Sequence, residues 1–274
     1  MKKTIIKISS LIVAGVILTT SCSKTGPAGA AGSAGGTGAT GPVLTGTVVG
    51  YVNLFDQYGE LLPASAAGEV YLTSNTKPGW KDSTYVNSSG ANTYSTTLTT
   101  GTYQFNLATK TGGFGNLQIN SLNVVGGGTQ YNTTPLQMAQ IPTFSVSALT
   151  VTTSTSTTNP SVAASFTVSG GDIAKGKKAI LFFGNSSSVS SNPSTYLGST
   201  VITLSPTFST STTNISCETV LFPAGADSSS VIYFTAYPIS YSNGASSYID
   251  VTTGKTIYNN LGTQLSGTYS VTIP

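Results

Sequence analysis

No histidine occurs among the 274 residues of this chain. Ser-His-Asp catalysis, Cys-His catalysis and most catalytic zinc sites are therefore excluded, because each needs an imidazole as base or metal ligand. The two cysteines, Cys22 and Cys217, are too few to build a metal cluster. No Gly-rich stretch lies between a predicted strand and a predicted helix, so no phosphate-binding loop is expected.

Arginine is also absent, and charged residues make up only 7% of the chain. Without arginine the chain has no bidentate fork for phosphate groups and no guanidinium to stack on bases. The formal charge of +3 comes from Lys2, Lys3 and Lys7 at the extreme N-terminus, and the remaining lysines are balanced by carboxylates. A nucleic-acid partner is therefore not expected.

Acidic residues are few and lie singly along the chain. A glycosidase needs two carboxylates across one cleft, and a calcium loop needs several oxygen ligands in close series. No spacing in the sequence brings such a set together, so we expect no enzyme activity, no metal and no cofactor. The eight acidic residues are Asp56, Glu60, Glu69, Asp82, Asp172, Glu218, Asp227 and Asp250.

The N-terminus carries a short apolar segment, Ile8–Leu18, after three lysines and before small and hydroxyl residues. This order is typical of a secretory signal peptide, and the segment is too short to remain as a membrane span. With Cys22 at its exit, the segment resembles a bacterial lipoprotein signal of the Bacteroidota type. The resemblance implies removal of residues 1–21, a lipid on the Cys22 sulfur and an outer-membrane location, on either face. The alternative is ordinary cleavage after Ser21, with Cys22 unmodified.

Residues 26–43 form six triplets that each begin with glycine. This resembles a collagen repeat, in which only glycine fits the crowded axis. Only Pro27 and Pro42 interrupt the small residues, so we expect residues 22–44 to be a flexible tether and the protein to be a monomer. A trimer held by this Gly-X-Y stretch is the alternative.

From Thr45 onward, apolar residues recur at the spacing of strands, with turn residues between them. Tyr103–Leu107 alternates between apolar and polar residues, whereas Ala179–Phe183 is apolar on both faces. We expect an all-β fold with two β-sandwich domains in tandem, residues 45–135 and 136–274. The segment Gln130–Pro142 is expected to be an extended linker that joins them.

The first domain resembles the carboxypeptidase regulatory-like, transthyretin-like sandwich. The resemblance covers about residues 45–130 and rests on Gly46-Thr47-Val48, Gly90-Ala91-Asn92-Thr93-Tyr94 and Gly101-Thr102-Tyr103-Gln104-Phe105. It implies a seven-stranded accessory sandwich without catalytic residues, and a long loop at Asn75–Val86 departs from it. The second strand series resembles an immunoglobulin or fibronectin sandwich.

Cys217 is expected to be a small buried hydrophobe on a strand of the second domain. If Cys22 carries a lipid, Cys217 has no partner for a disulfide.

The best candidates for ligand contact are Trp80 and Tyr85, both in the predicted Asn75–Val86 loop. An exposed indole stacks on sugars, whereas the alternative is that Trp80 packs the loop onto the sandwich. Lys175-Gly176-Lys177-Lys178 is expected to be a solvated turn, with contact to anionic headgroups as the alternative. Asp82-Ser83-Thr84 resembles a short Bacteroidota O-glycosylation pattern.

Together these features predict a non-enzymatic lipoprotein of the cell envelope, anchored to the membrane through Cys22. Its two sandwiches would serve adhesion, assembly or ligand capture, with a surface glycan or a protein as partner. The alternative is a carbohydrate-binding accessory protein of a polysaccharide uptake system, with Trp80 and Tyr85 as its platforms.

Overall fold

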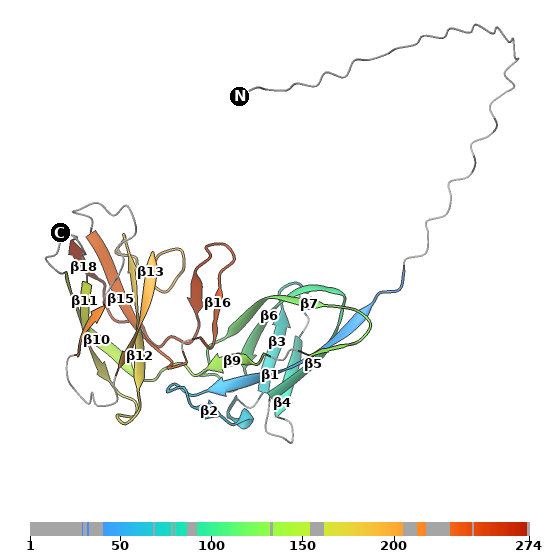
Figure 1. Ribbon diagram of the computed structural model, residues 1–274, viewed down its shortest axis with the longest axis horizontal. Helices are drawn as coiled ribbons and strands as arrows, with labels where there is room; N and C mark the ends of the chain where they lie inside the picture. The colour runs from blue at the N-terminus through green and yellow to red at the C-terminus, as the bar shows by residue number, and fades with distance from the viewer. Residues whose placement is uncertain are drawn as a thin grey trace, which may run out of the picture. The chain divides into compact units, whose positions relative to one another are not determined.

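The computed structural model describes residues 29, 32, 41–67, 69–77, 79, 81–86, 92–131, 134–153, 162–204, 213–217, 231–242 and 244–272 (Figure 1). The predicted signal peptide, Cys22 and Trp80 lie outside these residues, and Tyr85 and Cys217 are placed by their backbone only. Residues 42–274 form one compact unit. All the described strands belong to it.

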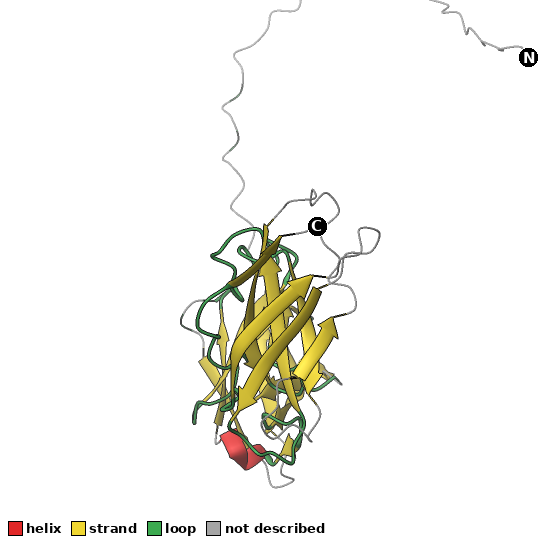
Figure 2. Ribbon diagram, turned by 90° about the vertical axis from the view of Figure 1, so that its left-hand side faces the viewer, coloured by secondary structure: helices red, strands yellow, loops and turns green. Residues whose placement is uncertain are grey.

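The described part of the chain is almost entirely β-structure, and the one helical element there is the 3-10 turn η1 (Ala64–Ala67) (Figure 2). The prediction of an all-β fold is therefore confirmed. No helix among the described residues has the length and apolar character needed to cross a membrane.

The first module is a nine-stranded sheet with the order β2-β1-β5-β4-β3-β6-β7, and β8 and β9 pair with β1. Its strands are β1 (Thr45–Phe55), β2 (Leu61–Leu62), β3 (Glu69–Ser74), β4 (Lys81–Val86), β5 (Asn92–Thr99), β6 (Gly101–Thr109), β7 (Leu117–Val124), β8 (Thr129–Tyr131) and β9 (Leu136–Ala139).

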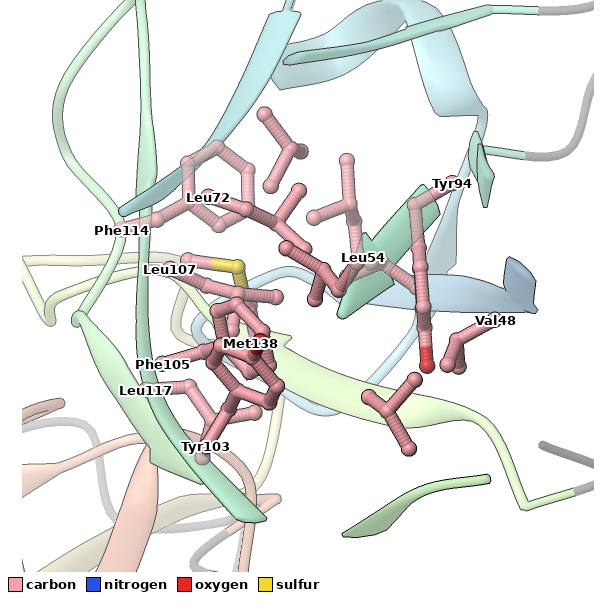
Figure 3. Packing of buried hydrophobic residues seen from close by; sticks show 14 residues of the cluster. Val48, Leu54, Leu72, Tyr94, Tyr103, Phe105, Leu107, Phe114, Leu117 and Met138 are labelled. Atoms are coloured by element: carbon pink, nitrogen blue, oxygen red, sulfur yellow. The ribbon is translucent and has the colours of Figure 1, made fainter. Parts of the chain in front are cut away.

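The core of the first module is formed by the inward-facing residues of strands β1, β3, β5, β6, β7 and β9 (Figure 3). As predicted, Tyr103, Phe105 and Leu107 of β6 are all buried, while the residues between them are partly exposed. Such alternation is expected of a strand with one face in the core. Phe105 and Leu107 are completely buried.

Two segments of the first module differ from the sequence-based expectation. The expected linker contains β8 and β9, which pair in parallel with β1, so the first sheet continues to Ala139. The pairing is favourable because Met138 of β9 becomes completely buried in the core. The expected loop Asn75–Val86 ends in strand β4, which pairs with β3 and β5.

The second module is a sandwich of a three-stranded sheet, β10-β11-β14, and a four-stranded sheet, β13-β12-β15-β18. A separate hairpin, β16-β17, follows β15. The strands are β10 (Ser145–Thr153), β11 (Val162–Ser169), β12 (Lys177–Gly184), β13 (Gly198–Leu204), β14 (Thr213–Cys217), β15 (Val231–Ile239), β16 (Ser247–Ile249), β17 (Thr256–Tyr258) and β18 (Tyr269–Thr272).

Strand β12 is buried on both faces, as its sequence predicts. Ala179 and Leu181 pack against residues of the three-stranded sheet, such as Phe166. Ile180 and Phe182 point to the opposite face and belong to a separate apolar cluster. The four-stranded sheet is therefore covered on both sides, and its second cover is made of loops and the β16–β17 hairpin.

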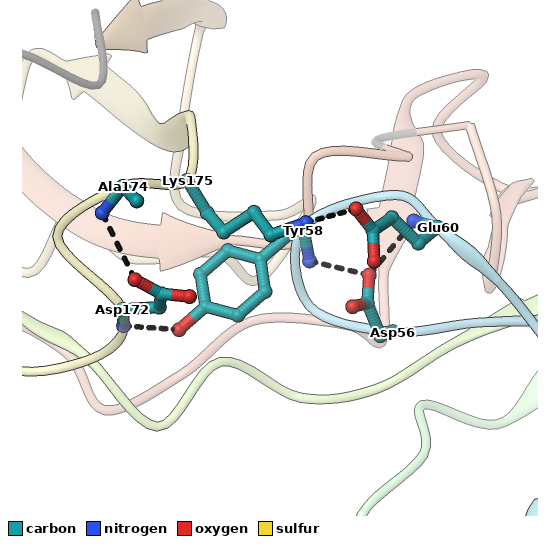
Figure 4. Close-up of polar contacts among 6 residues, drawn as sticks. All are labelled: Asp56, Tyr58, Glu60, Asp172, Ala174 and Lys175. Atoms are coloured by element: carbon teal, nitrogen blue, oxygen red, sulfur yellow. Dashed lines mark hydrogen bonds and ion pairs between the residues drawn. The ribbon is translucent and has the colours of Figure 1, made fainter.

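Polar contacts join the turn after β1 to the turn before β12 (Figure 4). The Asp172 backbone N–H donates to the Tyr58 hydroxyl at 2.5 Å, and the Lys175 ammonium pairs with Glu60. The Asp56 carboxylate accepts the N–H groups of Tyr58 and Glu60 at 2.9 and 2.8 Å and so shapes this turn.

A second group of contacts joins the modules, and the hydrogen bonds of Ser246 in it are buried. The Ser246 hydroxyl donates to the Gly115 carbonyl at 2.7 Å and accepts the Ala139 N–H at 3.0 Å. Asn259 donates through Nδ2 to the Asn116 carbonyl at 2.9 Å. These bonds connect the end of the first sheet with the β16–β17 region of the second module.

Candidate functional site

An aromatic cluster lies on the outer face of the four-stranded sheet. Phe182 of β12 is its centre, and the ring centroids of Tyr196, Tyr237 and Tyr258 lie 5.0, 5.5 and 6.0 Å from that of Phe182. The three tyrosines come from the loop after β12, from β15 and from β17. Tilted and edge-on pairs at these distances are favourable for aromatic rings. The cluster forms a rigid base for the loops above it.

The loop between β12 and β13 forms one wall over this base, and short polar side chains set its shape. Ser190 and Thr195 share a hydroxyl–hydroxyl hydrogen bond of 2.9 Å. The Asn192 carbonyl oxygen Oδ1 accepts the Ser194 N–H at 3.0 Å and the Ser194 hydroxyl at 2.9 Å. Such side-chain bonds to nearby backbone are typical of ordered turns.

The β16–β17 hairpin forms the facing wall, and Lys255 ties the two walls together. Its Nζ donates to the Pro193 carbonyl at 3.0 Å and to the Tyr196 carbonyl, and it lies 4.9 Å from the centre of the Tyr196 ring. The Tyr196 hydroxyl donates to the Thr256 carbonyl at 2.7 Å. The walls are thus held in place by the protein itself, before any ligand arrives.

Between the walls lies an open cleft of about 800 Å³, within the size range of small-molecule sites. The side chains that matter for its chemistry are neutral amides and tyrosines with one carboxylate: Asn192, Tyr237, Asp250, Tyr258, Asn259 and Gln264.

Asp250 is the one charged residue among the described residues that line the cleft. Its carboxylate accepts the Thr253 hydroxyl at 2.5 Å and the Thr253 N–H at 2.9 Å. These bonds hold the pKa of Asp250 below its usual range, and the bond from the Thr253 hydroxyl has the largest effect. Asp250 therefore stays ionised near neutral pH. Because no second carboxylate lines the described cleft, the arrangement suits binding and lacks an acid–base pair.

Burial raises the pKa of Tyr196 to about 12 from 10.0, and the neighbouring Tyr258 adds to this shift. A raised pKa means that the folded state favours the neutral phenol. The stability that the neutral Tyr196 phenol contributes is therefore complete below pH 10.0 and is lost as the pH rises towards about 12. Near neutral pH, Tyr196 therefore keeps the proton that it donates to Thr256.

Changing Tyr196 to Phe tests this titration. The variant should be less stable than the wild type at pH about 9 by roughly 0.5–1.5 kcal/mol, because the hydrogen bond to Thr256 is lost. At pH about 11 the difference should shrink, because only the wild type loses stability through ionisation of this phenol. Urea unfolding followed by circular dichroism measures both differences, and a difference that stays constant with pH would contradict the shift.

Of the residues predicted to bind a ligand, Tyr85 lies on strand β4, where its backbone pairs with Glu69 and Thr93. Tyr85 is therefore on a strand and not in a loop. Trp80 and Cys22 lie outside the described residues.

The lysine run is a solvated turn only in part: Lys175 lies partly exposed in the turn, whereas Lys177 and Lys178 belong to strand β12. Lys175 pairs with Glu60, which raises the pKa of Lys175. The Lys177 ammonium is buried and donates to the Asp172 carbonyl at 2.5 Å. Lys178 lies 4.3 Å from the centre of the Tyr241 ring, and burial lowers its pKa. Of these three lysines, Lys175 links the two modules through Glu60.

Within the described ranges no three His, Cys, Asp or Glu side chains gather into a possible metal site. The cleft residues Tyr237, Tyr258 and Gln264 were not identified from the sequence. The sequence held one clue: Ala179–Phe183 is apolar on both faces, so a second layer of residues must cover the outer face of its sheet.

No protein-family model matches the chain, and no curated protein is similar to it in sequence. Three solved structures align with it at low similarity. A DUF3823 family protein from Parabacteroides merdae is 16% identical, with a TM-score of 0.23 over 82% of this chain and all of that one. The TIE protein of Bacillus anthracis is 11% identical, with a TM-score of 0.24 over 83% of this chain.

The full-length major pilin SpaD of Corynebacterium diphtheriae is 9% identical, with a TM-score of 0.21 over 81% of this chain. The chain spans 34% of the Bacillus anthracis protein and 65% of the pilin. At these values the likenesses carry no argument about function, which rests on the site itself.

Proposed function

We propose that this chain is a membrane-anchored, non-enzymatic lipoprotein of the cell envelope that captures a ligand in the cleft of its second module. The cleft carries the proposal: it is pre-formed, lined by tyrosines and amides, and its one described carboxylate is bonded to its own turn. A site of this kind binds without supplying an acid–base pair. Adhesion and assembly at the envelope are roles that such a capture site would serve.

The anchor is supported by the N-terminal sequence, in which Cys22 follows the apolar signal segment. A single lipid chain holds a protein only weakly to a membrane, so stable attachment needs more than one acyl chain. The Gly-rich residues that follow would give the strands from Thr45 onward a flexible spacing from the bilayer.

Cys22→Ser tests the anchor. In cells fed a labelled fatty acid, the wild type should carry the label and sediment with the membranes, whereas Cys22→Ser should carry none and appear in the soluble periplasmic fraction. Cys217→Ser is the matched control and should keep the label. An unlabelled, soluble wild type would contradict the anchor, and protease treatment of intact cells shows which face the protein occupies.

Ligand capture is tested with the full chain carrying Cys22→Ser, on an array of envelope glycans and surface proteins. We expect saturable binding to at least one of these without cleavage of it. Turnover of the bound molecule, or no binding to any of them, would contradict the proposal.

The second candidate, a carbohydrate-binding accessory role, is favoured by the chemistry of the cleft. Tyr258 is partly exposed in the cleft and offers its ring and hydroxyl to a sugar, while Tyr237 is buried beneath. Asn192, Asn259 and Gln264 offer amide donors and acceptors.

A further inference from the structure

A second hollow lies beside the cleft along the same loop. This hollow has a volume of about 560 Å³ and lies between residues 187–190 and residues 264–268. Ser190 and Gln264 line both spaces, so the two hollows are neighbours, and we call them together the groove. Each part alone has the size of a small-molecule site, and together they offer room for a longer, extended ligand.

The second hollow is as poor in charge as the first. Serine, threonine, glycine and Gln264 line it together with the apolar Val189 and Leu265, and both of these are buried. Its polar groups are hydroxyls, amides and backbone groups, which donate and accept hydrogen bonds without a net charge. Such a lining matches a ligand that is itself neutral and rich in hydroxyls.

Lys255, the cation nearest the cleft, is already engaged by the Pro193 and Tyr196 carbonyls and by the Tyr196 ring. Asp250 remains as a fixed negative charge at the cleft end of the groove. Anionic polymers would meet repulsion there with no free lysine to offset it among the described lining residues. Sugar hydroxyls, in contrast, can donate to the carboxylate.

Gln264 occupies the junction of the two hollows and has a fixed orientation. Its Nε2 donates to the Thr235 hydroxyl at 3.1 Å, and the residue lines both hollows. A ligand that fills both hollows passes this side chain.

We propose that this groove binds a neutral linear oligosaccharide, with one set of sugar units over Tyr258 in the cleft and the following units in the second hollow. The proposal rests on the capture function above and names its ligand class and site. A chain that fills both hollows makes added contacts without paying the loss of translational and rotational freedom a second time. Affinity should therefore increase with chain length until the groove is full.

The test is calorimetric titration of the full chain carrying Cys22→Ser with neutral gluco- and manno-oligosaccharides of increasing length, up to about six units. We expect affinity for the best series to rise about tenfold or more between two and six units. Oligogalacturonates of the same lengths, which are anionic, should bind at least about tenfold more weakly.

Two variants separate the groove from other surfaces. Ser266→Glu in the second hollow should lower hexamer affinity about tenfold and leave dimer affinity nearly unchanged, whereas Gln264→Ala at the junction, which changes both hollows, should weaken both. Ser121→Glu, an exposed change on strand β7 of the first module, is the matched control and should alter neither.

Three outcomes would overturn the groove assignment: no binding of any neutral series, affinity independent of length, or hexamer binding that both groove variants leave intact. If binding instead disappears in Trp80→Ala, glycan capture stands and the site lies elsewhere. If only a surface protein on the array is bound, capture stands and the sugar assignment fails. If nothing on the array is bound, the proposed function fails as well.

Discussion

Phe182→Ala should lower the free energy of unfolding by about 3–5 kcal/mol. The Phe182 side chain is completely buried and is surrounded by the rings of Tyr196, Tyr237 and Tyr258. Its removal loses the free energy gained by transferring the ring out of water. It also leaves a cavity that closes only if the three surrounding tyrosine rings shift. Because these rings form the base of the cleft, ligand binding should weaken together with stability.

Equilibrium unfolding in guanidinium chloride, followed by far-ultraviolet circular dichroism, measures the loss. Val251→Ala provides the control, since Val251 lies in the turn of the β16–β17 hairpin and is 76% exposed. Its effect should stay within about 0.5 kcal/mol. A Phe182→Ala protein as stable as the wild type would show that the aromatic cluster is not packed as described.

Gly115→Ala should cost about 1–3 kcal/mol and loosen the contact between the two modules. A Cβ atom at residue 115 would lie 2.4 Å from the Asn259 carbonyl oxygen and 2.8 Å from the Asn260 nitrogen. Both are backbone atoms and cannot turn aside as the end of a side chain can. One of the two segments would have to shift, and the buried bond from Ser246 to the Gly115 carbonyl would be strained.

Gly128→Ala is the matched substitution, because no atom lies within 4 Å of the added Cβ there. It should leave stability almost unchanged. Amide hydrogen exchange then localises the effect: in Gly115→Ala, protection should fall at Ser246 and Asn259, whose N–H groups bond across this region. Equal behaviour of the two variants would contradict tight packing at Gly115.

The strands themselves could be predicted because their information is local. Alternation in Tyr103–Leu107 and the continuous apolar run Ala179–Phe183 each correspond to a strand with the expected burial. The parallel addition of β8 and β9 could not be predicted, because each strand is short and its partner, β1, lies far back in the sequence. Pairing of this kind depends on the whole sheet and not on the segment.

The cleft could not be predicted from the sequence for a related reason. Its residues come from the loop after β12, from β15, from the β16–β17 hairpin and from the segment before β18, and only the topology brings them together. Individually, Asn192 or Gln264 is an ordinary polar residue. The prediction for the lysine run was incomplete for a different reason. Its charges suggested a solvated turn, whereas in the fold Lys175 pairs with the carboxylate of the distant Glu60 and Lys177 donates to the nearby Asp172 carbonyl.

The parallel pairing of β1 with β9 also determines how the first module bears load. The chain enters β1 at Thr45 and leaves β9 at Ala139 towards the second module. Tension between these two points pulls the paired strands in opposite directions along their axes. Their hydrogen bonds are then loaded in shear, so that they must break together. If the strands were instead peeled apart, the bonds would break one at a time. Such an arrangement resists mechanical stretching.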